Sequence, residues 1–378
     1  MADYQINGFT DDRFAGARTA FEANIANGSD IGASYCATLD GKTVVDLWGG
    51  HADEARTRPW EEDTIVNVYS TTKTMTALCA LLLADRGELD FSAPVARYWP
   101  EFAANGKDGV TVAHLMSHSA GLPGWDNKVT KEVLYDWEQA TSLLAAQAPL
   151  WEPGTQIGYH AVTQGYLVGE VVRRISGQSL GTFFRTEIAE PLGADFHIGL
   201  PASEDHRVAD LVPPPGGAAI SDSDTAPFYR ILNTPPINPL ETRTRDWRAA
   251  EIPAAGGTSN ARAVAEIHAL LVNGGMAKGK QIMSEAGCRR ALEFQIEGTC
   301  QVMNVPLRLG MGFGMPSERM PLPSPNTVYW GGYGGSVILI DFDKRTTLAY
   351  VMNKMAGTTV GDMRSVMINM AMWQALAA

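Results

Sequence analysis

The chain has few of the features that mark secreted scaffolds, membrane proteins and nucleic-acid-binding proteins. It has only 4 cysteines in 378 residues, and they form no C-x-x-C pair and no disulfide-framework pattern. Acidic residues exceed basic ones, 42 to 30, and the net charge of −12 argues against nucleic acid or an anionic membrane as a partner. No apolar run is long enough to span a bilayer, and no secretory signal is visible. We therefore expect a cytoplasmic protein; the sequence indicates no oligomeric state.

Several catalytic and cofactor motifs are also missing. There is no G-x-S-x-G, so the usual nucleophile turn of α/β-hydrolases is absent. No G-x-G-x-x-G stands in a βαβ setting, which argues against nucleotide binding. His114 and His118 have the i,i+4 spacing of two zinc ligands, but no H-E-x-x-H motif and no third ligand accompany them. We expect neither a metal nor a cofactor.

The most informative stretch that is present is Ser70-Thr-Thr-Lys73. It lies where a β-branched run gives way to a long apolar run, a pattern that predicts a strand, a turn and a buried helix. Residues three apart share a helix face, so Ser70 and Lys73 can meet. A serine becomes a nucleophile when a base takes its proton, and a buried lysine with a lowered pKa is such a base. The alternative is a helix-capping serine beside a solvated lysine, and the local sequence leaves both open.

Strand patterns gather at the two ends of the chain, and helical patterns fill its middle. Asp40-Gly41 predicts a hairpin between two strands. Residues 213–253 contain 8 of the 21 prolines and are expected to be mostly loop. The other expected elements are helices over 11–27, 261–273 and 359–376, and strands over 32–39, 43–50, 327–332, 336–341 and 346–352.

These patterns predict an α+β fold. The strands come as hairpins and not as βαβ units, so the sheet is expected to be mainly antiparallel and built from both termini. We expect residues 1–90 and 254–378 to form this sheet domain with its flanking helices. Residues 91–253 are expected to form an inserted, mainly helical domain, with a site in the cleft between the two.

An ordered set of motifs then gives the chain a family resemblance. Over roughly residues 10–375 it resembles the serine β-lactamase and penicillin-binding-protein superfamily, and more narrowly the class C β-lactamase-like esterases called family VIII carboxylesterases. The resemblance implies a β-lactamase/transpeptidase-like fold. The motifs are Ser70-x-x-Lys73, HLMSHSAGL (114–122), WEPGTQIGY (151–159), AAGGTSNARAVAEIHALLVNGG (254–275) and WGGYGG (330–335).

The resemblance implies that Tyr159 shares proton transfer with Lys73. It matches the tyrosine of the family's Y-x-N motif, although Ala161 stands where the asparagine is usual. A tyrosine serves as a base if its phenolate faces a cation such as Lys73. His160 is the one histidine expected to line the cleft and bind substrate, and a histidine-based triad is the weaker alternative for the base. The other alternative is that Tyr159 is an ordinary core tyrosine.

Trp330-Gly331-Gly332 matches the Lys-Thr-Gly strand motif of β-lactamases and is expected to bind substrate. The family pattern implies an oxyanion hole made by the N–H groups of Ser70 and Tyr333. The two glycines indicate close approach of another backbone or of substrate. A cation in the Trp330 position would bind a substrate carboxylate, whereas an indole provides an apolar wall. A Gly-rich turn with a core tryptophan is the alternative.

Together these features predict a serine carboxylesterase. We expect it to hydrolyse neutral, short-chain small-molecule esters through an acyl-enzyme on Ser70, with no cofactor. A β-lactamase or D-aminoacyl peptidase on the same fold, or an acyltransferase, are the alternatives. A non-catalytic penicillin-binding-like module is disfavoured by the intact Ser70, Lys73 and Tyr159.

Overall fold

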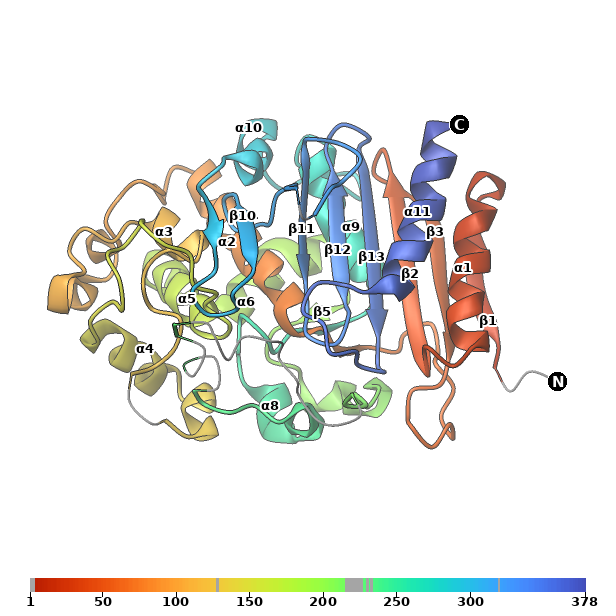
Figure 1. Ribbon diagram of the computed structural model, residues 1–378, viewed down its shortest axis with the longest axis horizontal. Coiled ribbons are helices and arrows are strands. Elements are labelled where there is room, and N and C mark those ends of the chain that lie inside the picture. The colour runs from red at the N-terminus through yellow and green to blue at the C-terminus, as the bar shows by residue number, and fades with distance from the viewer. Residues whose placement is uncertain (1–3, 127–128, 215–226, 229–230, 232–233, 319) are drawn as a thin grey trace.

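The fold is built on a six-stranded antiparallel sheet assembled from both ends of the chain (Figure 1). The computed structural model describes every residue except 1–3, 127–128, 215–226, 229–230, 232–233 and 319. Its strand order is β1-β3-β2-β13-β12-β11, and every neighbouring pair is antiparallel. The strands are β1 (Ile6–Thr10), β2 (Gly32–Leu39), β3 (Lys42–Gly50), β11 (Thr327–Gly331), β12 (Val337–Asp341) and β13 (Thr346–Met352).

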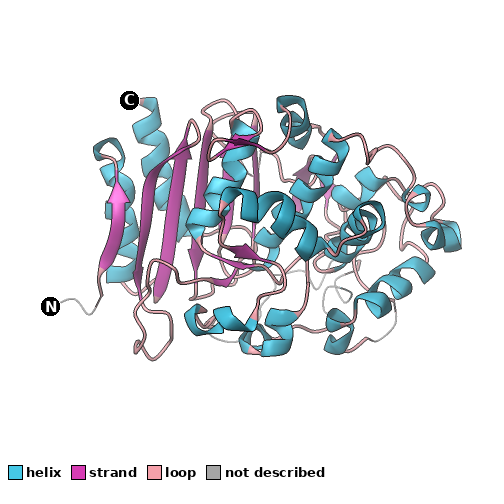
Figure 2. Ribbon diagram, turned by 180° about the vertical axis from the view of Figure 1, so that it is seen from behind, coloured by secondary structure: helices cyan, strands magenta, loops and turns pink. Residues whose placement is uncertain are grey.

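The two ends of the chain meet where β13 pairs with β2, with Tyr350 opposite Tyr35. Almost every residue of these two central strands is buried, because helices cover both faces of the sheet. Helices α1 (Ala15–Ala26) and α11 (Met363–Ala377) pack together in front of the sheet in Figure 1. Helix α9 (Ala261–Val272) packs on β2, β12 and β13 from the other face, which Figure 2 shows. The predicted antiparallel sheet is thus confirmed.

The middle of the chain is mainly helical and lies beside the β11 edge of the sheet (Figure 1). Helix α2 (Thr72–Asp85) is buried along almost its whole length and packs against α5 and α6. A short sheet, β4-β6-β5, ties this region to the main sheet domain. The domain boundaries at 90/91 and 253/254 stay a prediction. The further elements are α3 (Val112–Met116), α4 (Trp137–Ala146), α5 (Thr163–Ser176), α6 (Leu180–Phe184), α7 (Glu190–Leu192), α10 (Glu285–Arg289), β4 (Val66–Asn67), β5 (Phe196–His197), β6 (Thr258–Ser259), β7 (Met276–Ala277) and β8 (Lys280–Gln281).

Several features differ from the expectation. Strand β1 was not predicted, because its sequence INGFT is short and carries a glycine. A second hairpin, β9 (Ile296–Thr299) and β10 (Pro306–Leu309), was also missed. The expected loop 213–253 contains helix α8 (Arg245–Ala249), although residues 215–226 of it lie outside the described part. The last helix begins at Met363, just after its cap Asp362, and not at 359.

Among the described residues, no helix is long and apolar enough to cross a membrane.

Candidate active site

The fold brings Ser70, Lys73 and Tyr159 together. The Tyr159 Oη lies 2.6 Å from Ser70 Oγ, and Lys73 Nζ lies 3.1 Å from the same oxygen. Ser70 stands in a one-turn 3₁₀ helix over Tyr69–Thr71, and Lys73 stands in the first turn of α2. Tyr159 comes from the loop that precedes α5. All three side chains are buried, so the two shared contacts to Ser70 Oγ form in a site with little water.

The turn that carries Ser70 is held in an unusual shape. Tyr69, directly before the nucleophile, has a φ of +44°, which is unfavourable for a residue with a side chain. Its N–H donates to the Asn67 side chain at 3.1 Å. Ser336 donates to the Val68 carbonyl at 2.9 Å and shares a 2.9 Å hydrogen bond with Thr71. The β11–β12 turn therefore fixes the nucleophile turn against the edge of the sheet.

Lys73 is enclosed by hydrogen-bond acceptors. It is only 1% exposed, and besides Ser70 it contacts the carbonyl oxygens of Ala161 at 2.6 Å and Ala254 at 2.9 Å. Burial lowers the pKa of Lys73 well below its usual range. A neutral amine has two N–H groups, which match the two carbonyls, and one lone pair, which then faces Ser70 Oγ. This arrangement suits a base.

The surroundings of Tyr159 favour its neutral phenol. Burial raises its pKa, and the neighbouring Ser70 and Trp330 side chains oppose that rise only in part. Lys73 Nζ lies 4.9 Å from the centre of the Tyr159 ring, and the role of Tyr159 in proton transfer stays a prediction. The neutral phenol is placed to donate its proton to Ser70 Oγ.

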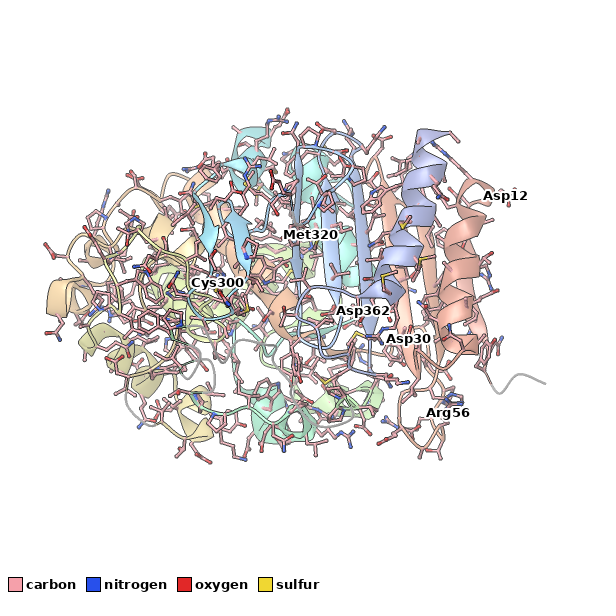
Figure 3. All side chains as sticks on the ribbon, in the orientation of Figure 1. Asp12, Asp30, Arg56, Cys300, Met320 and Asp362 are labelled. Carbon is pink, nitrogen blue, oxygen red and sulfur yellow. The ribbon has the colours of Figure 1, made fainter. Side chains whose placement is uncertain are left out.

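A residue that the sequence reasoning did not assign holds the Tyr159 loop. Cys300, labelled in Figure 3, directly follows β9 and accepts a hydrogen bond from the Tyr159 N–H at 3.2 Å. The adjacent Gln301 N–H donates to the Ile157 carbonyl at 2.7 Å. The β9–β10 hairpin thus fastens the main chain at the tyrosine and two residues before it. The cysteine lies in no motif of the sequence, so no local signal marked it.

The glycines of the Trp330-Gly331-Gly332 segment are required by close backbone contacts. A Cβ on Gly332 would lie 2.1 Å from the Val68 carbonyl oxygen, and one on Gly331 would lie 2.5 Å from Val360 Cα. The predicted close approach of another backbone is confirmed. It brings the end of β11 beside the nucleophile turn.

Tyr333 follows this segment and reaches the nucleophile turn. The Tyr333 and Tyr69 rings lie 5.5 Å apart edge to face. Within the described part of the chain, the N–H groups of Ser70 and Tyr333 donate no hydrogen bond. Their role as oxyanion donors stays a prediction. Farther along the loop, the Arg364 side chain donates to the Gly334 carbonyl at 2.9 Å and so restrains the segment.

His118 packs against the Tyr159 ring, and His160 follows Tyr159 in the same loop. His160 is fully buried; its Nδ1 contacts the Gly158 carbonyl at 2.5 Å, and its Nε2 accepts from the Leu122 N–H at 3.0 Å. Burial lowers its pKa to about 3, so the ring is neutral. With both nitrogens bonded to main chain, His160 supports the loop and offers no free nitrogen to substrate, contrary to the expected substrate contact.

For His118 the sequence suggests only a possible metal ligand, through its spacing to His114. Its Nδ1 accepts from the His160 N–H at 3.2 Å, and its ring stacks on Trp330 at 5.3 Å. His114 caps α3 together with Thr111. No group of His, Cys, Asp and Glu side chains among the described residues is arranged to hold a metal.

Comparisons with known proteins agree with this geometry. The family model described as beta-lactamase matches residues 19–368. The chain is 35% identical over 379 residues to the esterase/beta-lactamase LipL of Mycobacterium tuberculosis (strain H37Rv), covering 95% of this chain and 85% of the relative. The crystal structure of a family VIII carboxylesterase is 42% identical with a TM-score of 0.93, covering 98% of this chain and all 100% of that one. A penicillin-binding protein homologue from Caulobacter crescentus is 38% identical with a TM-score of 0.91, covering 98% and 100%. The chain therefore belongs to the beta-lactamase family and is a serine hydrolase of the esterase and β-lactamase type.

Proposed function

We propose that this protein is a carboxylesterase that hydrolyses neutral, short-chain esters through an acyl-enzyme on Ser70. The observation that carries the proposal is the position of Ser70 Oγ between Lys73 Nζ and Tyr159 Oη, and the N–H groups of Ser70 and Tyr333 are the proposed oxyanion donors. This combination supplies a nucleophile, a base, an acid and an oxyanion site within one buried cluster.

In the acylation step, the neutral Lys73 amine takes the Ser70 proton as Oγ attacks the ester carbonyl. The carbonyl oxygen becomes negative and is held by the N–H groups of Ser70 and Tyr333. When the tetrahedral intermediate collapses, the bond to the leaving alcohol breaks and Tyr159 protonates that oxygen. The proton on Lys73 then restores the Tyr159 phenol, so the pair returns to its starting charge.

Deacylation reverses the sequence with water in place of the alcohol. As water attacks the acyl carbonyl, Tyr159 takes a proton from the water and passes its own proton to Lys73, and Lys73 then protonates Ser70 Oγ as the acid leaves. These three side chains carry out every proton transfer, so the proposed reaction requires no cofactor.

The second candidate is β-lactam hydrolysis, because one relative is named an esterase/beta-lactamase. Trp330 argues against it as the main activity, since an indole cannot form an ion pair with the carboxylate of a β-lactam. The test compares p-nitrophenyl butyrate with nitrocefin on the wild type, Ser70→Ala and the exposed-serine control Ser203→Ala. We expect ester turnover to predominate and to vanish only in Ser70→Ala. Nitrocefin turnover equal to ester turnover would favour the second candidate.

A further inference from the structure

The proposed mechanism fixes where the leaving alcohol must lie. Lys73 is buried behind Ser70 and is bonded to two carbonyl oxygens, so it does not reach a departing group. Tyr159 Oη is the acid within hydrogen-bonding distance of Ser70 Oγ, and general acid catalysis requires contact with the leaving oxygen. The first atoms of the alcohol therefore lie beside Tyr159, on the side bounded by Trp330.

A cavity opens at that position. It contains about 370 Å³ of empty space, including its open mouth, and both Tyr159 and Trp330 line it. Most of its other wall residues are apolar, and they include Met303, Leu307, Leu309 and Val360, although Thr359 and Tyr329 also line it. No charged side chain is among the described residues that line it.

The β9–β10 hairpin forms one wall of this cavity. Met303 lies in its turn, and Leu307 and Leu309 lie on β10. The same hairpin is fastened to the Tyr159 loop by the Cys300 and Gln301 contacts. The wall of the cavity and the proton donor are therefore parts of one connected unit, so the cavity keeps a fixed position relative to the acid.

We propose that this cavity binds the alcohol portion of the substrate and that the preferred alcohol is an uncharged, apolar one. The inference rests on the proposed esterase function. An alkyl alcohol gains free energy by leaving water for the Met303, Leu307 and Val360 walls, whereas a charged alcohol would lose hydration without finding a partner. The acyl portion then lies on the opposite side of Ser70, away from this cavity.

The test uses two isomeric esters that place the same alkyl chain on opposite sides of the carbonyl. Hexyl acetate carries the chain on the alcohol, and methyl heptanoate carries it on the acyl group; methyl acetate has neither. Leu307→Asp and Met303→Gln make the cavity wall polar. Phe294→Asp is the matched control, because Phe294 is exposed near β9 and does not line the cavity. A thermal melt checks that each variant is folded.

We expect each wall variant to lower kcat/KM for hexyl acetate by at least about tenfold, since a misfit in an apolar pocket changes specificity by that order. Methyl acetate and methyl heptanoate should change by less than about twofold, and Phe294→Asp should behave as wild type. A selective loss on methyl heptanoate, or an equal loss on all three esters in a folded variant, would overturn the inference while leaving the esterase function intact. A wild type that hydrolyses none of the esters would overturn both.

Discussion

Lys73 donates a 2.6 Å hydrogen bond to the main-chain oxygen of Ala161, at the position where the family's Y-x-N motif usually has an asparagine. The main chain thus supplies an anchor for the base, and the missing amide side chain does not leave Lys73 without a partner. A main-chain anchor does not depend on which residue stands there.

Ala161→Asn should therefore leave ester hydrolysis nearly unchanged. Because the Lys73 contact is made by the carbonyl, kcat for p-nitrophenyl butyrate should stay within about twofold of wild type, as for substitutions that remove no contact. Steady-state kinetics measure this. A large fall in kcat in a folded variant would show that the side chain at 161, and not the main chain, controls the base.

The buried Lys73 predicts a stability that depends on pH. Burial lowers its folded-state pKa, so the unfolded chain binds the Lys73 proton at pH values where the native state does not. This group's contribution to the free energy of unfolding therefore rises with pH from the folded pKa up to the unfolded one. The wild type should gain stability relative to Lys73→Met between about pH 7 and about pH 9.5.

Urea unfolding of both proteins at the two pH values measures that difference. Lys42→Met, which removes an exposed lysine, is the control and should show no such divergence from wild type. Parallel pH dependence of wild type and Lys73→Met would mean that Lys73 is charged in the folded protein and is not the resting base.

Cys300 is expected to act as a positioning residue for Tyr159. Cys300→Ala removes the acceptor of the Tyr159 N–H, so kcat should fall by roughly tenfold, the effect of about 1.4 kcal/mol in the barrier, with KM little changed. Cys300→Ser keeps an acceptor and should retain more activity. The buried Cys288→Ala is the control for loss of a core thiol. Equal kcat in the alanine and serine variants would leave packing alone as the role of Cys300.

Arg364 links the end of the sheet to the loop that carries Tyr333. It is buried, lies 2.8 Å from Asp30 and 2.6 Å from Asp362, and donates to the Gly334 carbonyl. The labelled Asp30 and Asp362 lie close together at the start of α11 in Figure 3. Arg364→Met should cost about 3–5 kcal/mol of unfolding free energy, because Asp30 is left as an unpaired buried charge.

Chemical denaturation measures that cost, and Arg289→Met on the exposed end of α10 is the control. The loosened loop should also lower kcat in the variant that remains folded. Unchanged stability of Arg364→Met would contradict the assignment of this ion pair as a buried one.

The sequence contains enough local pattern to predict the sheet and the catalytic pair. Asp40 and Gly41 mark the hairpin through their left-handed backbone. The spacing of Ser70 and Lys73 brings their side chains together because the 3₁₀ turn that carries Ser70 runs directly into helix α2, which carries Lys73. The β9–β10 hairpin escaped prediction because its strands are four residues each and include a glycine and a proline.

The remaining parts of the site depend on contacts between distant segments. Cys300 touches Tyr159 across 141 residues of sequence, and His118, from the middle of the chain, stacks on Trp330 of strand β11. Burial raises the pKa of Tyr159, and no sequence motif predicts that burial. Such features become visible only when the packing is known.

The acyl-enzyme on Ser70 is tested most directly by acid-quenched mass spectrometry of the protein after brief mixing with p-nitrophenyl butyrate. The wild type should carry one butyryl group on the peptide that contains Ser70, and Ser70→Ala should carry none. Butyryl on another residue, or equal labelling of Ser70→Ala, would contradict the assignment of Ser70 as the nucleophile.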